Sequence, residues 1–180
     1  MSKLQQSQET EAMLRESWIG TLYASKRLSS YGGTGKALAE LIKAQGAEWP
    51  TLGGNLWLHG PKSWEVALTF SGALAVRGSS VKALHISRLA DMLDNFETAS
   101  LGLVEDAALV CLQGVYDESY DTCPFESRTL YRLEAFFQNR VAMELSTVIS
   151  ATSDVSLADW WGEPFRSLIE DHYTRYETTL

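Results

Sequence analysis

Apolar residues first recur with a helical period near the N-terminus. Over residues 9–28, Leu14, Trp18 and Leu22 follow one another at intervals of four, which is the spacing of one face of an α-helix. Residues 1–7 are polar, lack this pattern and are expected to fray. The pattern therefore predicts one helix over residues 9–28.

A second amphipathic segment follows a run of serine and glycine. Leu38 and Ile42 would face the core from a helix over residues 34–44. Thr34 is a residue type that favours the N-cap position, so we expect it to begin this helix. Residues 46–54 contain a proline and several glycines and are predicted to form a loop.

Beyond residue 54, short apolar runs alternate with amphipathic segments. The predicted strands span residues 55–59, 81–86, 107–112 and 145–151. The predicted helices span residues 64–76, 88–96, 124–142 and 164–169, with Ser87 capping the second and Pro124 opening the third. Residues 171–178 fit an edge strand and a helix equally well. Strands that alternate with helices are typical of βαβ units, so we predict an α/β fold with a mostly parallel sheet covered by helices on both faces.

Length and composition are typical of one globular domain. The 180 residues are 45% hydrophobic and 21% charged. We expect a single domain in which an N-terminal helical segment, residues 1–50, packs on an α/β core, residues 51–180. No apolar run approaches the roughly 18 residues that cross a bilayer, and the N-terminus shows no secretory signal. These features predict a cytoplasmic protein without membrane association.

Acidic residues outnumber basic ones by 23 to 15, which gives a net charge of −8. Nucleic-acid-binding domains usually carry a basic stripe, and the nearest approach to one is the pair Lys26-Arg27. Direct binding to nucleic acid is therefore not expected. Cys111 and Cys123 are too few for a disulfide framework or a zinc site. Cys111 lies in an apolar run and is expected to be a buried, unreactive thiol.

Residues 55–61, 77–86, 109–115, 146–152 and 162–168 follow one another in an order, and with local sequences, that resemble the AAA+ ATPases of bacterial replication. These are the DnaA-type initiators, the Hda regulator and the DnaC/IstB-type helicase loaders. In the family these segments correspond to the first strand and the start of the phosphate loop (55–61), the end of the first helix and the second strand (77–86), the Walker B strand (109–115), the sensor-1 strand (146–152) and the arginine-finger region (162–168). The resemblance covers about residues 30–175 and implies a three-layer RecA/AAA+-like, P-loop NTPase-like fold without a lid domain.

The stretch that corresponds to the phosphate loop departs from the family pattern. A phosphate loop needs glycines that let backbone N–H groups wrap the phosphates, a lysine on the β- and γ-phosphates, and a Ser or Thr on Mg²⁺. Here the stretch is short and lacks the Gly-Lys-Ser/Thr element. It consists of Gly60, Pro61, Lys62, Ser63, Trp64 and Glu65. Trp64 and Glu65 add bulk and negative charge where an anion would lie.

The other catalytic positions of the family also differ. The Walker B strand should end in two acidic residues, one on Mg²⁺ and one that polarises water, and Leu112 and Gln113 stand there instead. Thr152 or Ser153 stands where sensor 1 usually has Asn, and Leu168 takes the position of the finger arginine. Losing these elements together indicates a pseudo-ATPase, with no catalytic residues and no cofactor or metal.

The resemblance implies a non-catalytic adaptor or regulator that binds a partner ATPase, helicase or initiator. Its candidate contact surfaces are the degenerate loop 60–65, an acidic loop and the segment 160–166. The residues expected to bind a partner are Asp117, Glu118, Asp121, Trp160, Trp161 and Arg166. Tryptophan is enriched at interface hot spots, which is the reason to include Trp160 and Trp161. Self-association is left open.

Two other functions remain open from the sequence. A phage or mobile-element inhibitor that mimics a replication ATPase would suit the small, acidic chain. An enzyme with a repurposed site at the carboxyl ends of the strands would use His59, His85, Gln113 and Asp117, because loops at those ends form the sites of parallel sheets.

Overall fold

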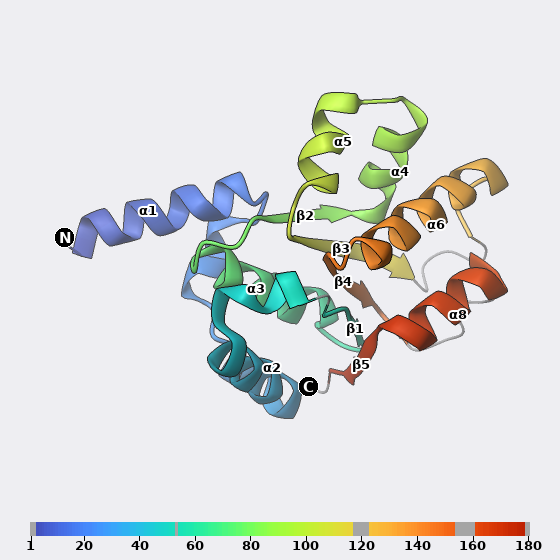
Figure 1. Cartoon of the computed structure of the whole chain (residues 1–180). Coiled ribbons are helices and arrows are strands. Elements are labelled where there is room, and N and C mark those ends of the chain that lie inside the picture. The colour runs from blue at the N-terminus through green and yellow to red at the C-terminus, as the bar shows by residue number, and fades with distance from the viewer. Residues whose placement is uncertain (1–2, 53, 117–122, 154–160, 179–180) are drawn as a thin grey trace.

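A layer of parallel strands lies between two layers of helices (Figure 1). The computed structural model describes residues 3–52, 54–116, 123–153 and 161–178. The strands are β1 (Leu56–His59), β2 (Val81–His85), β3 (Leu109–Tyr116), β4 (Ser146–Ala151) and β5 (Thr174–Glu177). The α-helices are α1 (Lys3–Glu16), α2 (Gly32–Gln45), α3 (Ser63–Ala75), α4 (Ile86–Asp94), α5 (Thr98–Glu105), α6 (Ser127–Ala142) and α8 (Glu163–His172). The short 3₁₀ helices are η1 (Thr21–Ser25), η2 (Leu28–Ser30) and η3 (Gly46–Leu52).

The described strands form one sheet in the order β2-β3-β4-β1-β5, and each of these pairings is parallel. All five carboxyl ends therefore lie at the same edge of the sheet. The predicted α/β fold with a parallel sheet is confirmed. The segment that sequence patterning left open, residues 171–178, contains the end of α8 and the edge strand β5.

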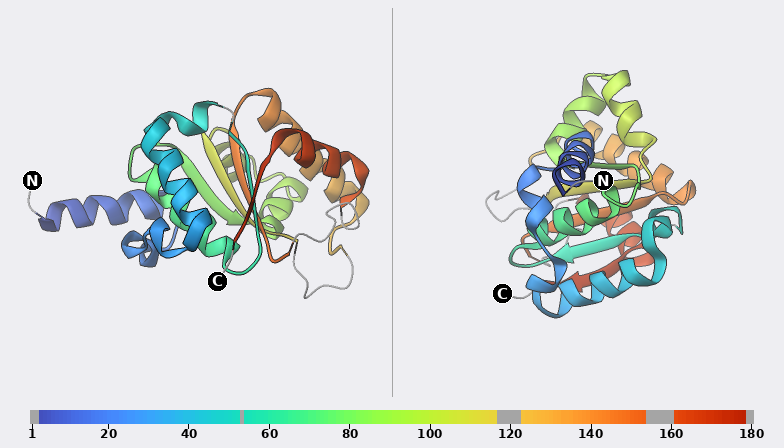
Figure 2. Two further views of the ribbon diagram at one scale, coloured as in Figure 1. Left: turned by 90° about the horizontal axis from the view of Figure 1, so that it is seen from below. Right: turned by 90° about the vertical axis from the view of Figure 1, so that its left-hand side faces the viewer.

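Alternate residues of the strands enter two separate hydrophobic cores. Leu109 and Cys111 of β3 pack in the core under α2 and α3. Val110 and Leu112 of the same strand pack in the core under α4, α6 and α8. Figure 2 shows the two helix layers from further directions. Because both faces of β3 are covered, its sequence is a continuous apolar run rather than an alternating one.

Cys111, which was expected to be an unreactive thiol, is completely buried. Its side chain has no exposed surface, and removal from water raises the pKa of its thiol to about 12. The prediction of a buried, unreactive thiol agrees with both observations.

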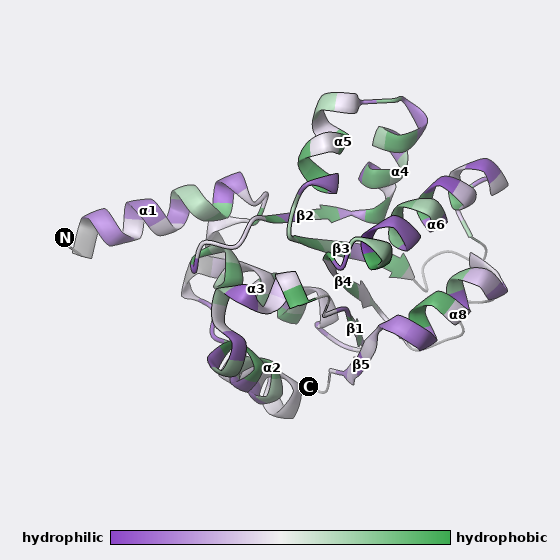
Figure 3. Cartoon of the chain, viewed as in Figure 1, coloured by the Kyte–Doolittle hydropathy of each residue, from purple (hydrophilic) through white to green (hydrophobic). Residues whose placement is uncertain are grey.

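The predicted helix over residues 9–28 is wrong in its second half and at its start. The helix α1 begins already at Lys3 and ends at Glu16, and Trp18 adopts a positive φ of 59°. The physical reason lies at the sheet edge, where the N–H of Ala83 in β2 donates to the carbonyl of Ser17 at 3.0 Å. The chain leaves the helix to supply that acceptor. Hydrophilic residues dominate α1, which points away from the body (Figures 1 and 3).

Helix starts were predicted less well than helix cores. Thr34 is not an N-cap: it lies inside α2, and its hydroxyl donates to the carbonyl of Glu177. Ser87 is not a cap either, because α4 begins at Ile86 and its N-cap is His85, whose ring accepts from the N–H of Ser87.

Three other segments also differ from the pattern-based prediction. The long helix begins three residues after Pro124. Residues 46–52 form η3 instead of an open loop, with the ring of Trp49 buried. The helix α5 was not predicted. No helix within the described ranges is long and apolar enough to cross a membrane.

The N-terminal region contributes to the same core as the strands. Leu14, Leu38 and Trp49 are buried together with Leu58 of β1 and Phe70 of α3. The boundary proposed at residue 50 stays a prediction.

One buried guanidinium contacts several elements at the amino edge of the sheet, where the parallel strands begin. Arg140, at the end of α6, is 2% exposed. Its N–H groups donate to the carbonyls of Val104, Glu105, Ala108 and Ser146. It also donates to the Thr147 hydroxyl. Burial lowers the pKa of Arg140 to about 10, so it stays charged at neutral pH. One side chain thus joins α6 to the end of α5 and the starts of β3 and β4.

We expect Arg140→Met to lower the free energy of unfolding by about 3 kcal/mol, because carbonyl groups that the guanidinium satisfies become buried and unpaired. Arg140→Lys should lower the free energy of unfolding by a smaller amount, since an ammonium keeps the charge but lacks the planar fork of donors. Urea denaturation followed by tryptophan fluorescence measures both. The control is Arg128→Met, an exposed position on the same helix. Equal losses for the two Met variants would contradict this role.

Candidate functional site

The site expected for a nucleotide lies where β1 passes into α3. Three residues, Gly60 to Lys62, connect the strand to the helix. The N–H of Gly60 donates to the carbonyl of Ala151 at 3.2 Å, and the N–H of Ser63 donates to the carbonyl of Gly60 at 3.2 Å. The Ser63 hydroxyl also donates to Ala151, at 2.8 Å. The turn is therefore tied to β4 by groups that a phosphate loop would direct at its ligand.

The edge strand β5 closes the same turn from the other side. The N–H of Thr178, just after β5, donates to the carbonyl of His59 at 2.7 Å, and its hydroxyl donates to the carbonyl of Pro61 at 2.6 Å. Gly60 has a φ of +99°, and a Cβ there would lie 2.7 Å from the Thr178 carbonyl. Glycine is needed at this position both for its conformation and for the close approach of the two backbones.

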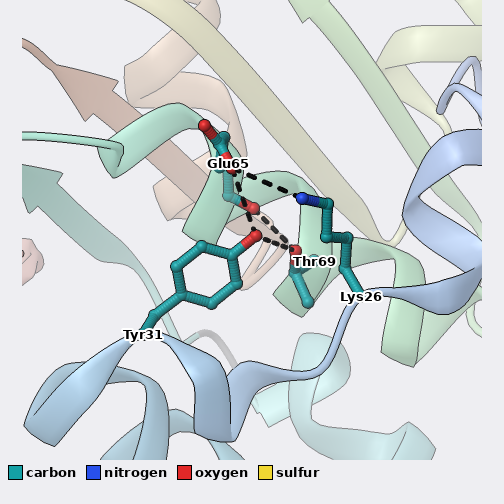
Figure 4. A network of polar contacts seen from close by, with 4 residues as sticks. All are labelled: Lys26, Tyr31, Glu65 and Thr69. Carbon is teal, nitrogen blue, oxygen red and sulfur yellow. Dashed lines mark hydrogen bonds and ion pairs between the residues drawn. The ribbon is translucent and has the colours of Figure 1, made fainter.

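The first turn of α3 carries a carboxylate that contacts the N-terminal segment. Glu65 accepts a hydrogen bond from the Tyr31 hydroxyl at 3.4 Å and lies 3.9 Å from the Lys26 ammonium (Figure 4). Thr69, one turn further along α3, donates to the backbone carbonyl of Glu65 and contacts the Tyr31 hydroxyl. Negative charge in the first turn is favourable to the helix dipole. The N-terminal segment thus holds the start of α3 through Lys26 and Tyr31.

At the Walker B position, β3 is irregular. Leu112 is fully buried and pairs with Ile149, but the next pairing joins Tyr116 to Ala151. The bulge between them contains Gln113 and Gly114, and Gly114 has a φ of +75°. A Cβ at Gly114 would lie 2.3 Å from the His85 ring. A bulge redirects side chains at the end of a strand, and here it brings the His85 ring against the strand.

Trp161 contacts this bulge from the core under α4, α6 and α8. The indole N–H of Trp161 donates to the carbonyl of Val115 at 2.8 Å. Its ring stacks on Phe165, with the centroids 4.3 Å apart, and contacts Phe137 and Phe125. Trp161 is 7% exposed. It is therefore a core residue that offers little surface to a partner, and its partner-binding role stays a prediction.

The cavity between the turn and the bulge is small. It measures about 60 Å³ and is lined by Ser63, Trp64, His85, Gln113, Gly114, Ser150, Ala151 and Thr152. Pockets for drug-sized ligands usually span about 300–1,000 Å³. In this conformation the space would hold a water molecule or a small ion rather than a nucleotide.

The residues proposed for a repurposed enzyme are only partly brought together. His85 and Gln113 are paired in register on β2 and β3. His59 lies on β1, beyond β3 and β4, so roughly 14 Å of sheet separates it from His85. Its Nε2 accepts from the Arg175 guanidinium at 2.9 Å, and the ring is 6% exposed. His59 therefore holds the edge strand, while Asp117 lies outside the described residues.

A larger cavity of about 460 Å³ lies beside His85, between α4 and α6. Asp94, one of three carboxylates in its lining, accepts a hydrogen bond from Thr129 and another from Arg132. The hydrogen bond from Thr129 is the main cause that lowers the pKa of Asp94, and the contacts with Arg132 lower it further. Across the described residues, no group of three or more His, Cys, Asp or Glu side chains is placed to bind a metal.

The remaining predicted contact residues divide by exposure. Pro61 and Lys62 are exposed, and Trp64 and Glu65 are half-buried. Arg166 lies on the exposed face of α8, 2.8 Å from Glu170 and 3.7 Å from Glu163. Leu168, at the position of the finger arginine, packs against the core. Asp117, Glu118, Asp121 and Trp160 lie outside the described residues.

Sequence reasoning missed the residues that close the site. Lys26, Tyr31 and Thr178 reach it from segments far away in the chain, and no local pattern marks them. Gly114 did carry a signal, because an isolated glycine within a strand often marks a bulge.

Comparison with known proteins places this geometry within one class. No family model and no curated protein matches the chain. Among solved structures, the DnaC helicase loader superposes with a TM-score of 0.70 at 14% identity, over 87% of this chain and 98% of that one. DnaI superposes at 0.65 and 19% identity, over 94% and 91%. AMPPCP-bound DnaA from Aquifex aeolicus superposes at 0.63 and 14% identity, over 83% of this chain and 48% of DnaA.

The fold is therefore that of the P-loop NTPase-like α/β proteins. Within that class, it is similar to the replication-type AAA+ proteins, as the resemblance in sequence predicted.

The close approach of Gly60 to Thr178 can be tested by mutation. Gly60 and Gly78 have nearly equal φ values, +99° and +96°, but a Cβ at Gly78 would meet open space. Gly78→Ala should cost about 1 kcal/mol of unfolding free energy from backbone strain alone. Gly60→Ala should cost about 2 kcal/mol more, because β5 must move away. Urea denaturation compares the two, and equal losses would show that β5 does not close the turn tightly.

Proposed function

We propose that this protein is a non-catalytic adaptor or regulator that binds a partner ATPase, helicase or initiator. The observation that carries the proposal is a replication-type AAA+ fold whose β1–α3 connection is a three-residue turn, hydrogen-bonded on both sides to β4 and Thr178. The proposal places the chain in the cytoplasm, where such partners act.

The chemistry at the carboxyl edge supports an inactive site. A hydrolytic site needs a phosphate cradle, a magnesium ligand and a group that polarises water. The Gly60 and Ser63 N–H groups are already bonded within the protein. Leu112 is buried and apolar, and Glu65 places a carboxylate at the start of α3. None of these arrangements favours a bound triphosphate.

A domain of this kind can still act through its surface. The resemblance implies that AAA+ subunits meet across the nucleotide site. A chain with a closed site could occupy such an interface, or cap it, without turning over ATP. The exposed residues Lys62 and Arg166 are the proposed contact points on the described part of the carboxyl edge and on α8.

If the nucleotide site is closed, ATP should not stabilise the protein. A ligand that binds the native state at 100 times its Kd would add about 2.7 kcal/mol of stability. We expect no change in Tm with millimolar Mg-ATP or Mg-ADP, and no phosphate release above a no-protein blank. An active AAA+ ATPase assayed in parallel is the positive control. A clear nucleotide-dependent rise in Tm would contradict the closed site.

Partner binding is tested with a matched pair of charge reversals. Lys62 and Glu144 are both exposed and have φ values of 59° and 57°, but they lie at opposite edges of the sheet. Candidate ATPases captured from native lysate should be purified and titrated against each variant. We expect Lys62→Glu to weaken binding about fivefold to tenfold, and Glu144→Lys to leave it unchanged.

Arg166→Glu extends the same measurement to α8. If Lys62→Glu and Arg166→Glu both bind as the wild type does, the proposed surface is wrong. If no replication ATPase, helicase or initiator binds the wild-type protein, the proposed function is wrong.

A further inference from the structure

A groove on the α2–α3 side of the molecule concentrates positive charge on an acidic protein. It has a volume of about 540 Å³ and lies between the η1–η2 segment, α2 and the end of α3. The charged residues that line it are Lys26, Arg27, Lys36, Glu40, Lys43 and Arg77. Five positive charges and one negative give the lining a net charge of +4. The rest of the chain then carries −12, because the whole carries −8.

The uncharged lining of this basic groove is mostly apolar, with Ser29 and Thr69 as its polar members. Leu28, Ala39, Ile42 and Ala73 line it between the charged residues. Ala39 and Ala73 are half-exposed, whereas Leu28 and Ile42 show only a small part of their surface. Small side chains on two neighbouring helices leave the groove open. An occupant would therefore meet an apolar strip with positive charges on its borders.

The basic residues on the border differ in the contacts that they already make, and Arg77 donates to the Ala73 carbonyl at 2.7 Å. All five are exposed. Lys43 pairs with Glu40 on the surface of α2, where both side chains are about 70% exposed, and such pairs are worth little in water. Lys26 is 3.9 Å from Glu65, a long contact. Lys36 and Lys43 are separated by roughly 10 Å along α2, or two helical turns.

We propose that this basic groove binds an acidic amphipathic helix of a partner protein. Apolar side chains of that helix, at positions i, i+3, i+4 and i+7, would lie on the alanine and leucine floor. Its flanking carboxylates would face the lysines and arginines on both borders. Two turns of contact along α2 match the length over which such a helix presents two or three apolar anchors.

The lining favours a peptide over single-stranded nucleic acid. Grooves for single strands combine positive charge with aromatic rings on which the bases stack. Among the described residues that line this groove there is no aromatic side chain. The apolar part of the lining consists of aliphatic groups, which complement leucine or isoleucine better than a base.

This inference assigns a partner chemistry without requiring that the partner be an ATPase. The test therefore uses a synthetic peptide of about 20 residues, long enough to form a helix by itself, with Leu at helical spacing and Glu on the flanks. Fluorescence anisotropy measures its affinity for the full chain. A peptide with Lys in place of Glu, and a single-stranded oligonucleotide, are titrated in parallel. The result expected is binding of the acidic peptide, weakened by salt, with no binding of the basic one.

Charge and shape are then tested separately. The double variant Lys36→Glu/Lys43→Glu should weaken peptide binding at least about tenfold. Ala39→Phe keeps every charge but fills the floor, and it should weaken binding by a similar factor. Arg128→Glu is the control, because Arg128 is an exposed arginine on α6 in the opposite layer. Unfolding curves confirm that each variant is folded.

The other outcomes overturn the proposal. Tighter binding of the oligonucleotide, lost in the double variant, would make the groove a nucleic-acid site. Self-association that the double variant abolishes would make a second copy of the chain the occupant. An acidic peptide that fails to bind, or that binds equally well to Ala39→Phe, would show that the groove does not hold an amphipathic helix. None of these results bears on whether a replication ATPase binds at Lys62.

Discussion

All described strands run in the same direction, and the other features of the molecule follow from this constraint. Parallel neighbours need crossover connections, so helices must cover both faces of the sheet. The strand starts gather at one edge and the strand ends at the other. At the amino edge, carbonyl groups from several elements meet in a dry space, where the Arg140 guanidinium satisfies them. At the carboxyl edge, the turns that follow the strands form the surface at which parallel sheets usually bind ligands.

At the carboxyl edge, the β1–α3 turn is held by hydrogen bonds within the chain. Thr178 binds the backbone of residues 59 and 61, and Ser63 binds Ala151. Glu65 occupies the start of α3, held by Lys26 and Tyr31. The hydrogen-bonding capacity of the turn is used internally, which stabilises the fold. This is the physical basis for proposing that the protein acts by binding other proteins.

Net charge alone is a poor guide to this surface. A value of −8 argues against a protein that binds polyanions, yet five of the basic side chains line one groove. They come from residues 26–43 and from residue 77, so no run of basic residues appears in the sequence. Their meeting depends on the packing of α2 against α3. The groove and the β1–α3 turn share Lys26, which lines the groove and also lies 3.9 Å from Glu65.

The sequence by itself determined the α/β class, β1 to β4 with small shifts at their ends, and the cores of α2, α3, α4, α6 and α8. Periodicity is local, and burial on both faces leaves a continuous apolar run such as Leu109 to Leu112. It also marked the short β1–α3 connection, because the spacing from Asn55 to Ser63 is visible in one chain. Only the tertiary structure decided the rest. The end of α1, the burial of Trp161 and the hydrogen bonds of Thr178 each depend on a partner far away in sequence. Local patterns carry no information about such a partner.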